Sequence, residues 1–164
     1  MSISEKIESI GTPAKRPPVV LVLAMLLFLL ATGGFYGAYM LLADTSGAML
    51  GTPLSLLDHL PIHTFLVPGI ILLIFMGVIP AITVLGVLRV ELFHVFQRFS
   101  LLKRYSWAYC SSVFTGFFLT GWTVGEIILW GANSLSVIYM LWGILILLVC
   151  VVPKTRKHFA IINL

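Results

Sequence analysis

Four long apolar stretches dominate this chain of 164 residues, and all of its lysines and arginines lie on one side of them. The basic residues stand before the first stretch, between the second and third, and after the fourth: Lys6, Lys15, Arg16, Arg89, Arg98, Lys103, Arg104, Lys154, Arg156 and Lys157. The other two connections contain none. Basic residues mark the cytoplasmic side of membrane proteins, so this distribution predicts four membrane spans with both chain ends in the cytoplasm.

The composition agrees with a membrane protein. Hydrophobic residues make up 60% of the chain and charged residues 10%, whereas about a quarter of an ordinary soluble domain is charged. The net charge is +4, but the basic residues flank apolar runs and form no patch with interleaved aromatic residues. We therefore interpret them as topology signals and contacts with anionic lipids, with the bilayer as partner and no role in binding nucleic acid.

The predicted fold is all-α: a polytopic membrane protein with an antiparallel bundle of four transmembrane helices in a single domain, residues 19–152. The spans are expected at about residues 19–43, 65–90, 105–130 and 134–152. The first is long enough to cross about 30 Å of hydrocarbon with some tilt. Residues 1–18 are expected to form a cytoplasmic tail, and residues 153–164 a basic, frayed cytoplasmic tail. The first apolar run is longer than the core of a cleaved signal peptide, which favours a retained helix. The plasma (inner) membrane of a prokaryote is the expected location.

Two connections are expected to lie in the membrane interface. Residues 44–64 mix acidic residues and histidines with leucines, which is typical of an interfacial outer segment. Pro53 and Pro61 bracket a predicted short helix in this segment. Residues 89–104 mix basic with large apolar side chains, which predicts a helix along the cytoplasmic interface.

Small residues and one proline predict how the helices pack. Gly33 and Gly37 in the first span, and Gly121 and Gly125 in the third, are four residues apart, so that neighbouring backbones can approach closely. Pro80 lies in the middle of the second span. It cannot donate a backbone hydrogen bond, which predicts a kink there.

Glu126 is the one acidic residue clearly inside an apolar span. A helical stripe of small and polar residues shares its face, and this stripe consists of Ala108, Ser111, Ser112, Thr115, Leu119, Trp122, Thr123 and Glu126. Intramembrane carboxylates usually face the bundle interior or a water-filled cavity. The candidate residues for a ligand or proton site are therefore Glu126, Thr123, Trp122, Thr115 and Ser112. The alternative is a carboxylate that is hydrated near the headgroups, or that accepts an interhelical hydrogen bond from a tyrosine or threonine.

A metal site on the outer segment is the second candidate. Asp58, His59 and His63 are residue types that bind divalent metals, but Pro61 stands between the two histidines and no second ligand pair is present. Solvated interfacial residues are the competing interpretation. No cofactor is predicted, because the two cysteines form no CxxC pair and the spans carry no facing histidines for haem.

Three short segments resemble a group of small, uncharacterised four-span membrane proteins of prokaryotes. They are Gly33-Gly34-Phe35-Tyr36-Gly37, Pro53-Leu54-Ser55-Leu56-Leu57 and Phe65-Leu66-Val67-Pro68-Gly69. This resemblance covers about a quarter of the chain. It implies the four-span architecture and no activity or ligand set.

Three functions are consistent with these features. The leading hypothesis is a non-enzymatic accessory or interaction subunit, bound to another membrane protein or to further copies of itself, or a binder of a lipid-like molecule through a groove along the third span. The second is a small transporter or channel protomer that uses Glu126. The third is a membrane enzyme with an extracytoplasmic metal site at Asp58, His59 and His63.

Overall fold

Four helices are long and apolar enough to cross a membrane, so the chain is a multi-pass, all-helical membrane bundle. The computed structural model describes residues 17–52, 54–58, 61–88 and 105–160, and none of these forms a named strand. The four spans are Pro18–Ala43, Leu66–Leu88, Trp107–Trp130 and Ser134–Val151. Their ends lie within two residues of the predicted ones. The cytoplasmic tail predicted for residues 1–18 and the interfacial helix predicted for residues 89–104 lie almost wholly outside the described residues.

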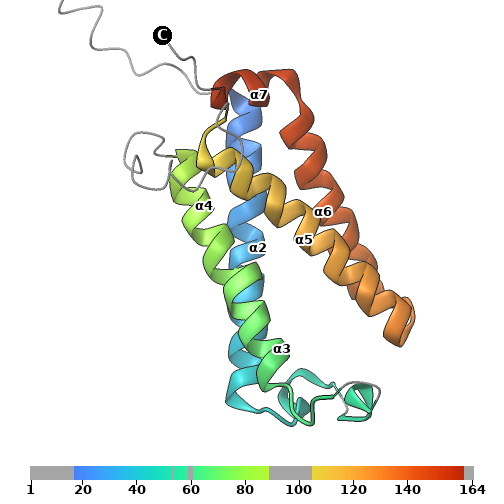
Figure 1. Cartoon of the computed structure of the whole chain (residues 1–164). Helices are drawn as coiled ribbons and strands as arrows, with labels where there is room; N and C mark the ends of the chain where they lie inside the picture. Colours follow the sequence, from blue (N-terminus) through green and yellow to red (C-terminus); the bar gives the residue numbers. More distant parts are fainter. Residues whose placement is uncertain (1–16, 53, 59–60, 89–104, 161–164) are drawn as a thin grey trace, which may run out of the picture.

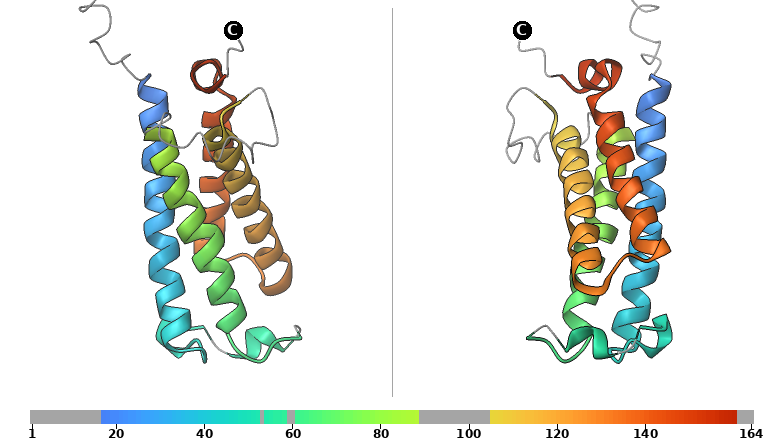
Figure 2. Two further views of the ribbon diagram at one scale, coloured as in Figure 1. Left: turned by 60° about the vertical axis from the view of Figure 1, so that its left-hand side comes forward. Right: turned by 90° about the vertical axis from the view of Figure 1, so that its right-hand side faces the viewer.

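The helices form two antiparallel hairpins (Figure 1). The first hairpin pairs α2 (Pro18–Ala43, 26 residues) with a helix made of three parts, α3 (Leu66–Ile71), η3 (Leu72–Val78) and α4 (Ile79–Leu88). The second pairs α5 (Trp107–Trp130) with α6 (Ser134–Val151, 18 residues). The two hairpins meet mainly where α4 packs on α5, and the second is tilted against the first (Figures 1 and 2). We call the end that carries Pro18, Leu88 and Trp107 the basic end, and the opposite end the loop end.

The core lies between the hairpins and is built from aliphatic side chains that are fully buried. Leu23, Leu27, Val87, Leu119 and Ile146 are its central members. Large apolar side chains on the outer helix faces are exposed, as expected for helices surrounded by lipid. Lipid tails are as apolar as leucine, so close contact between helices depends on small residues instead of on a hydrophobic driving force.

The closest contact between α5 and α6 is made by Gly116 and Gly143. A Cβ atom on Gly143 would lie 2.5 Å from Oγ1 of Thr120, and one on Gly116 would lie 2.8 Å from Cδ2 of Leu147. A larger residue at either glycine would push the two helices apart. These two glycines were not singled out by the sequence pattern, which pointed to Gly121 and Gly125.

Pro80 follows directly on an irregular stretch of helix. Residues Leu72–Val78 are π-helical, and the amide of Ile79 donates to the carbonyl of Ile74, five residues earlier. Proline lacks an amide hydrogen and its ring crowds the carbonyl four residues before it, here that of Met76. The wider π turn is one of the known responses to such crowding. The kink predicted at Pro80 stays a prediction. The helix carries a π-helical segment before Pro80 and continues through it.

The connection between the first two spans is a folded segment that packs on the helix ends. It contains two 3-10 turns, η1 (Ala48–Leu50) and η2 (Leu54–Leu57), so the short helix predicted between residues 53 and 61 is present as η2. Leu57 is buried against Leu41 and Phe65. The indole of Trp130, at the end of α5, donates a 2.6 Å hydrogen bond to the carbonyl of Leu56. This bond ties the second hairpin to the connection of the first.

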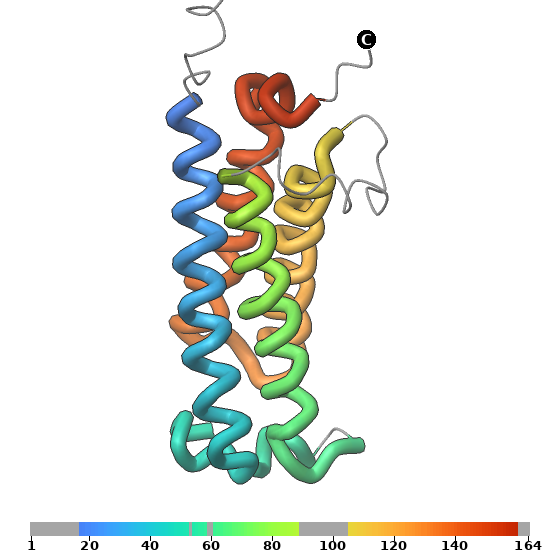
Figure 3. The backbone as a smooth tube through the Cα atoms, turned by 90° about the vertical axis from the view of Figure 1, so that its left-hand side faces the viewer, coloured from blue at the N-terminus to red at the C-terminus, as the bar shows by residue number. Residues whose placement is uncertain are grey.

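The residues after the fourth span form a short helix, so the prediction of a frayed tail is wrong for residues 153–160. Helix α7 (Pro153–Phe159) lies across the basic end of the bundle (Figure 3). Its proline stands at the first helical position, where no amide hydrogen is needed. Phe159 is only 2% exposed, and its carbonyl accepts a 2.9 Å hydrogen bond from the amide of Ser106. The basic character of residues 153–164 did not predict that the ring of Phe159 is buried.

Candidate functional site

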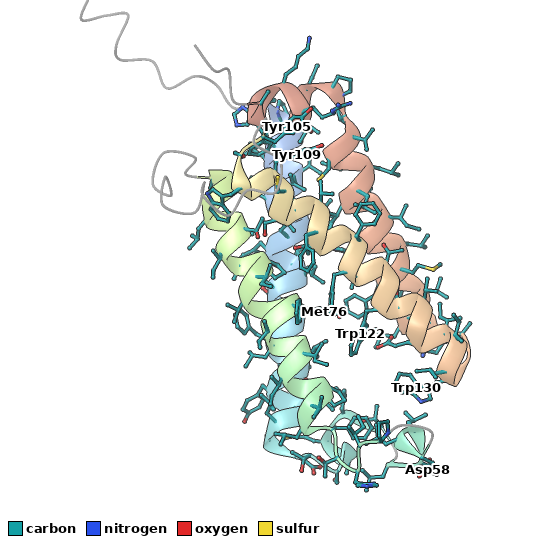
Figure 4. All side chains as sticks on the ribbon, viewed as in Figure 1. Asp58, Met76, Tyr105, Tyr109, Trp122 and Trp130 are labelled. Atoms are coloured by element: carbon teal, nitrogen blue, oxygen red, sulfur yellow. The ribbon has the colours of Figure 1, made fainter. Side chains whose placement is uncertain are left out.

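Glu126 joins the two helices of the second hairpin. Its Oε1 accepts a 2.6 Å hydrogen bond from Nε1 of Trp122, one turn earlier on α5. Its Oε2 accepts a 3.2 Å hydrogen bond from Oγ of Ser136 on α6. The carboxylate is half-buried and lies about 6 Å along the axis from the last residue of α5. Trp122 is labelled in Figure 4, in the loop-end half of α5.

The tight turn between α5 and α6 places Ser136 beside Glu126. Gly131 has φ +82°, a left-handed conformation that other residues rarely adopt. Asn133 then caps α6, because its side-chain oxygen accepts a 2.9 Å hydrogen bond from the amide of Ser136. Ser136 was not predicted as a partner of Glu126, although an asparagine just before an apolar run is a helix-start signal.

The rest of the predicted stripe faces the bundle interior, as its helical spacing indicated. Ser112, Thr115 and Thr123 are at most 1% exposed. Each hydroxyl donates to the backbone carbonyl four residues earlier on α5. These three side chains are therefore buried inside the bundle.

One further hydroxyl pair links the hairpins. Oγ1 of Thr83 on α4 and Oγ of Ser111 on α5 are 2.6 Å apart, and the Thr83 hydroxyl also lies 2.7 Å from the carbonyl of Ile79. Ser111 belongs to the predicted stripe. The partner of Ser111 in the first hairpin is thus Thr83, which lies on the helix that contains Pro80.

The two predicted glycine pairs have different surroundings. A Cβ atom on Gly33 would lie 3.2 Å from the hydroxyl of Tyr139, and one on Gly37 would lie 2.8 Å from Cδ2 of Leu72. No described atom lies within 4 Å of a Cβ atom on Gly121 or Gly125. The first pair therefore packs within this chain, whereas the second faces outward.

The open pair lies on a continuous apolar surface of α5. We call this surface the glycine face and define it as Phe117, Gly121, Val124, Gly125 and Ile128. At 100° per residue these positions fall within about 100° of one another around the helix. Phe117 is 65% exposed and Ile128 is 76% exposed. Within the described part of the chain, the glycine face is left uncovered.

The residues of the predicted metal site are not drawn together where they are described. Asp58 and His63 are both exposed, and His59 lies outside the described residues. Figure 4 shows Asp58 at the edge of the loop end. Among the described residues, no three histidine, cysteine or acidic side chains are grouped closely enough to hold a metal ion.

Asp44 organises the start of the same connection. Its Oδ1 accepts hydrogen bonds from the hydroxyl and the amide of Ser46, at 2.6 Å and 3.0 Å. Its Oδ2 accepts a 3.0 Å hydrogen bond from the amide of Met49. These bonds stabilise the carboxylate and lower the pKa of Asp44 below the ordinary value of 3.8. An open depression of about 550 Å³ adjoins this turn, lined by Ser46, Ala48, Gly51, Thr52 and Leu54.

The basic end carries a second depression. It was not predicted, because the basic residues were interpreted as topology signals and lipid contacts. Its volume is about 280 Å³, and it is lined by Tyr105, Pro153, Arg156, Lys157 and Ala160. Nη2 of Arg156 donates a 3.2 Å hydrogen bond to the hydroxyl of Tyr105. We call these five residues the basic-end pocket.

Comparison with protein-family models, with curated proteins and with solved structures finds no match. The resemblance of the three short segments to uncharacterised four-span proteins stays a prediction.

Proposed function

We propose that this protein is a non-enzymatic interaction subunit of the plasma membrane that associates with other membrane helices through the glycine face of α5. The observation that supports this proposal is the pair Gly121 and Gly125, four residues apart on an exposed helix face with no described atom against them. Small residues at this spacing allow two helix backbones to approach closely in lipid, where van der Waals packing drives association. The partner is another membrane protein or a second copy of this chain.

The contrast with the other glycines supports this role. Gly33, Gly37, Gly116 and Gly143 all have close neighbours within the chain, so their small size is explained by the fold. Gly121 and Gly125 have no such explanation. Glycine inside a helix costs about 1 kcal/mol relative to alanine. The exposed Gly121 and the half-buried Gly125 therefore weaken α5 without a packing gain among the described residues.

A photoreactive residue in place of Val124 tests the proposal in native membranes. We expect it to form protein adducts, which mass spectrometry identifies, whereas the same residue in place of Leu148 on the exposed side of α6 forms mainly lipid adducts. Gly121→Leu should abolish the protein adducts at position 124 and leave the fold intact, because nothing described lies against Gly121. Equal protein adducts at both positions, or adducts that survive Gly121→Leu, would contradict the proposal.

A second candidate function is a small transporter or channel protomer that uses Glu126. It is favoured by the half-buried carboxylate within a membrane span, since such groups commonly mark ion or proton pathways. Its two hydrogen bonds, from Trp122 and Ser136, equally suit a clamp between α5 and α6. Glu126→Gln should abolish pH-dependent flux in proteoliposomes if the carboxylate carries protons or cations, and equal flux in the variant removes Glu126 from any transport mechanism.

The proposed orientation places the basic end in the cytoplasm. It rests on the distribution of the ten lysines and arginines along the sequence. The loop end, with Glu126 and the outer segment, then faces away from the cytoplasm.

A further inference from the structure

The basic-end pocket has a fixed framework. Residues Tyr105 and Ala160 form an antiparallel backbone bridge, and the amide of the neighbouring Ser106 donates to the carbonyl of Phe159. The ring of Tyr109 stacks on that of Tyr105, with 4.8 Å between centroids, and its centroid lies 6.0 Å from that of Phe159. Figure 4 shows Tyr105 and Tyr109 together beneath α7. These contacts hold the start of α5 against the end of α7.

The pocket carries positive charge, and none of the described acidic residues lies at the basic end. Arg156 and Lys157 are consecutive, and both side chains are exposed. The acidic residues in the described part of the chain are Asp44, Asp58 and Glu126, and all three belong to the loop end. The hydrogen bond to the Tyr105 hydroxyl engages one nitrogen of the Arg156 guanidinium and so sets its direction. Within the described residues, the structure shows no acidic partner for the other guanidinium nitrogens or for the ammonium group of Lys157.

The chemistry and size of the pocket suit a phosphate ester. A guanidinium binds two phosphate oxygens at once, and an ammonium group adds a point charge. The volume of about 280 Å³ lies just below the range of about 300–1,000 Å³ that encloses a drug-sized ligand. The depression is therefore large enough for a phosphate headgroup.

The position of the pocket indicates a lipid as the source of that phosphate. Pro153, which lines the pocket, follows the last residue of α6 by two positions. The exposed side of α6 is apolar and runs from there along the span, through Val151, Leu148, Leu145 and Leu141. A phospholipid with its phosphate in the pocket would lay its acyl chains along this side.

We propose that the basic-end pocket binds the phosphate of an anionic phospholipid, with Arg156 and Lys157 as its ligands and Tyr105 as the residue that positions Arg156. The site does not involve the glycine face. A negative result for the phospholipid site would therefore leave the proposed helix association unchanged. A negative result for the helix association would likewise leave the phospholipid site unchanged.

Native mass spectrometry of the full chain tests the site by counting retained phosphatidylglycerol and, with matched acyl chains, phosphatidylcholine. We expect wild-type protein to retain phosphatidylglycerol preferentially, and Arg156→Gln with Lys157→Gln to weaken that retention by more than ten-fold. Lys154→Gln is the matched control, because Lys154 is exposed on the same helix but does not line the pocket. The Lys154→Gln variant should retain phosphatidylglycerol at most about five-fold more weakly than wild type, which is the effect of removing one cation near an anionic surface.

Two further variants keep the net charge of the protein. They therefore distinguish a specific phosphate site from general electrostatic attraction to anionic lipid. Arg156→Lys removes the fork of donors and Tyr105→Phe removes the positioning hydroxyl, so each should weaken phosphatidylglycerol retention several-fold. Wild-type retention in Arg156→Lys would overturn the site. Thermal unfolding in detergent checks that each variant is folded. Glycerol phosphate, added to lipid-free protein, tests the source: binding with the same dependence on Arg156 and Lys157 would overturn the lipid assignment in favour of a soluble phosphate ester.

Discussion

The backbone carbonyl of Met76 lies directly against the α-carbon of Gly34, so that a Cβ atom on Gly34 would overlap it. That carbonyl is the one whose helical partner would be the missing amide hydrogen of Pro80. The π-helical segment η3 and the glycine of α2 therefore meet at one point. The wider turn before Pro80 is accommodated only because α2 presents no side chain there.

Gly34→Ala should destabilise the bundle by about 1–3 kcal/mol, because the added methyl group meets backbone atoms that cannot rotate away. Unfolding in a graded series of denaturing detergent measures the change. Gly125→Ala is the control, since no described atom lies within 4 Å of its Cβ position, and it should leave stability unchanged or raise it by up to about 1 kcal/mol. An equal loss in both variants would mean that α2 and η3 do not approach this closely.

The hydrogen bond between Glu126 and Ser136 should contribute a measurable coupling. Hydrogen bonds between side chains of membrane helices average about 0.6 kcal/mol, with a maximum of about 1.7 kcal/mol. A double-mutant cycle with Glu126→Ala and Ser136→Ala should give a coupling free energy in this range. A cycle that pairs Glu126→Ala with Ser112→Ala, whose hydroxyl bonds within α5, should give none. Equal couplings in the two cycles would contradict the bridge between α5 and α6.

The turn held by Asp44 should loosen in acid. The pKa of Asp44 is lowered in the folded protein, so its stabilising effect is complete above the ordinary pKa of 3.8 and is lost as the pH falls through the folded value. Amide hydrogen exchange at Ser46 and Met49 should accelerate over that interval, after correction for the intrinsic pH dependence of exchange. Asp44→Asn should show fast exchange at neutral pH and no further change in acid. A wild-type profile without an acid step would contradict the assignment.

The two ends of the bundle should lie on opposite sides of the membrane. In a background that carries Cys110→Ser and Cys150→Ala, an impermeant maleimide should label Asp58→Cys in intact cells and Lys154→Cys only after the membrane is opened. Both positions are exposed in the structure, so access to the reagent depends on sidedness alone. The reverse pattern would invert the proposed topology.

The spans were predictable because length, hydropathy and turn residues all act locally. Gly131 and Asn133 mark the turn between α5 and α6, and α5 ends at Trp130 and α6 begins at Ser134, as predicted. The inward orientation of Ser112, Thr115 and Thr123 followed from helical spacing in the same way. Glu126 was recognised as a candidate because a carboxylate within an apolar run is unusual.

The contacts between helices were less predictable. A glycine pair does not indicate whether its partner is inside the chain, so Gly121 and Gly125 were singled out while Gly116 and Gly143 were not. The difference depends on the rotation of α5 about its axis, which the whole bundle determines. The basic-end pocket was missed for a related reason, since it forms only when α7 folds back onto Tyr105, far away in the sequence.

The unequal lengths of α2 and α6 have a consequence for the surrounding bilayer. At 1.5 Å per residue the 26 residues of α2 extend about 39 Å, and the 18 residues of α6 about 27 Å. Neither length equals the hydrocarbon depth of about 30 Å, so we expect lipids to adapt slightly beside α6 and α2 to tilt. From these lengths we expect thinner hydrocarbon beside α6 than beside α2.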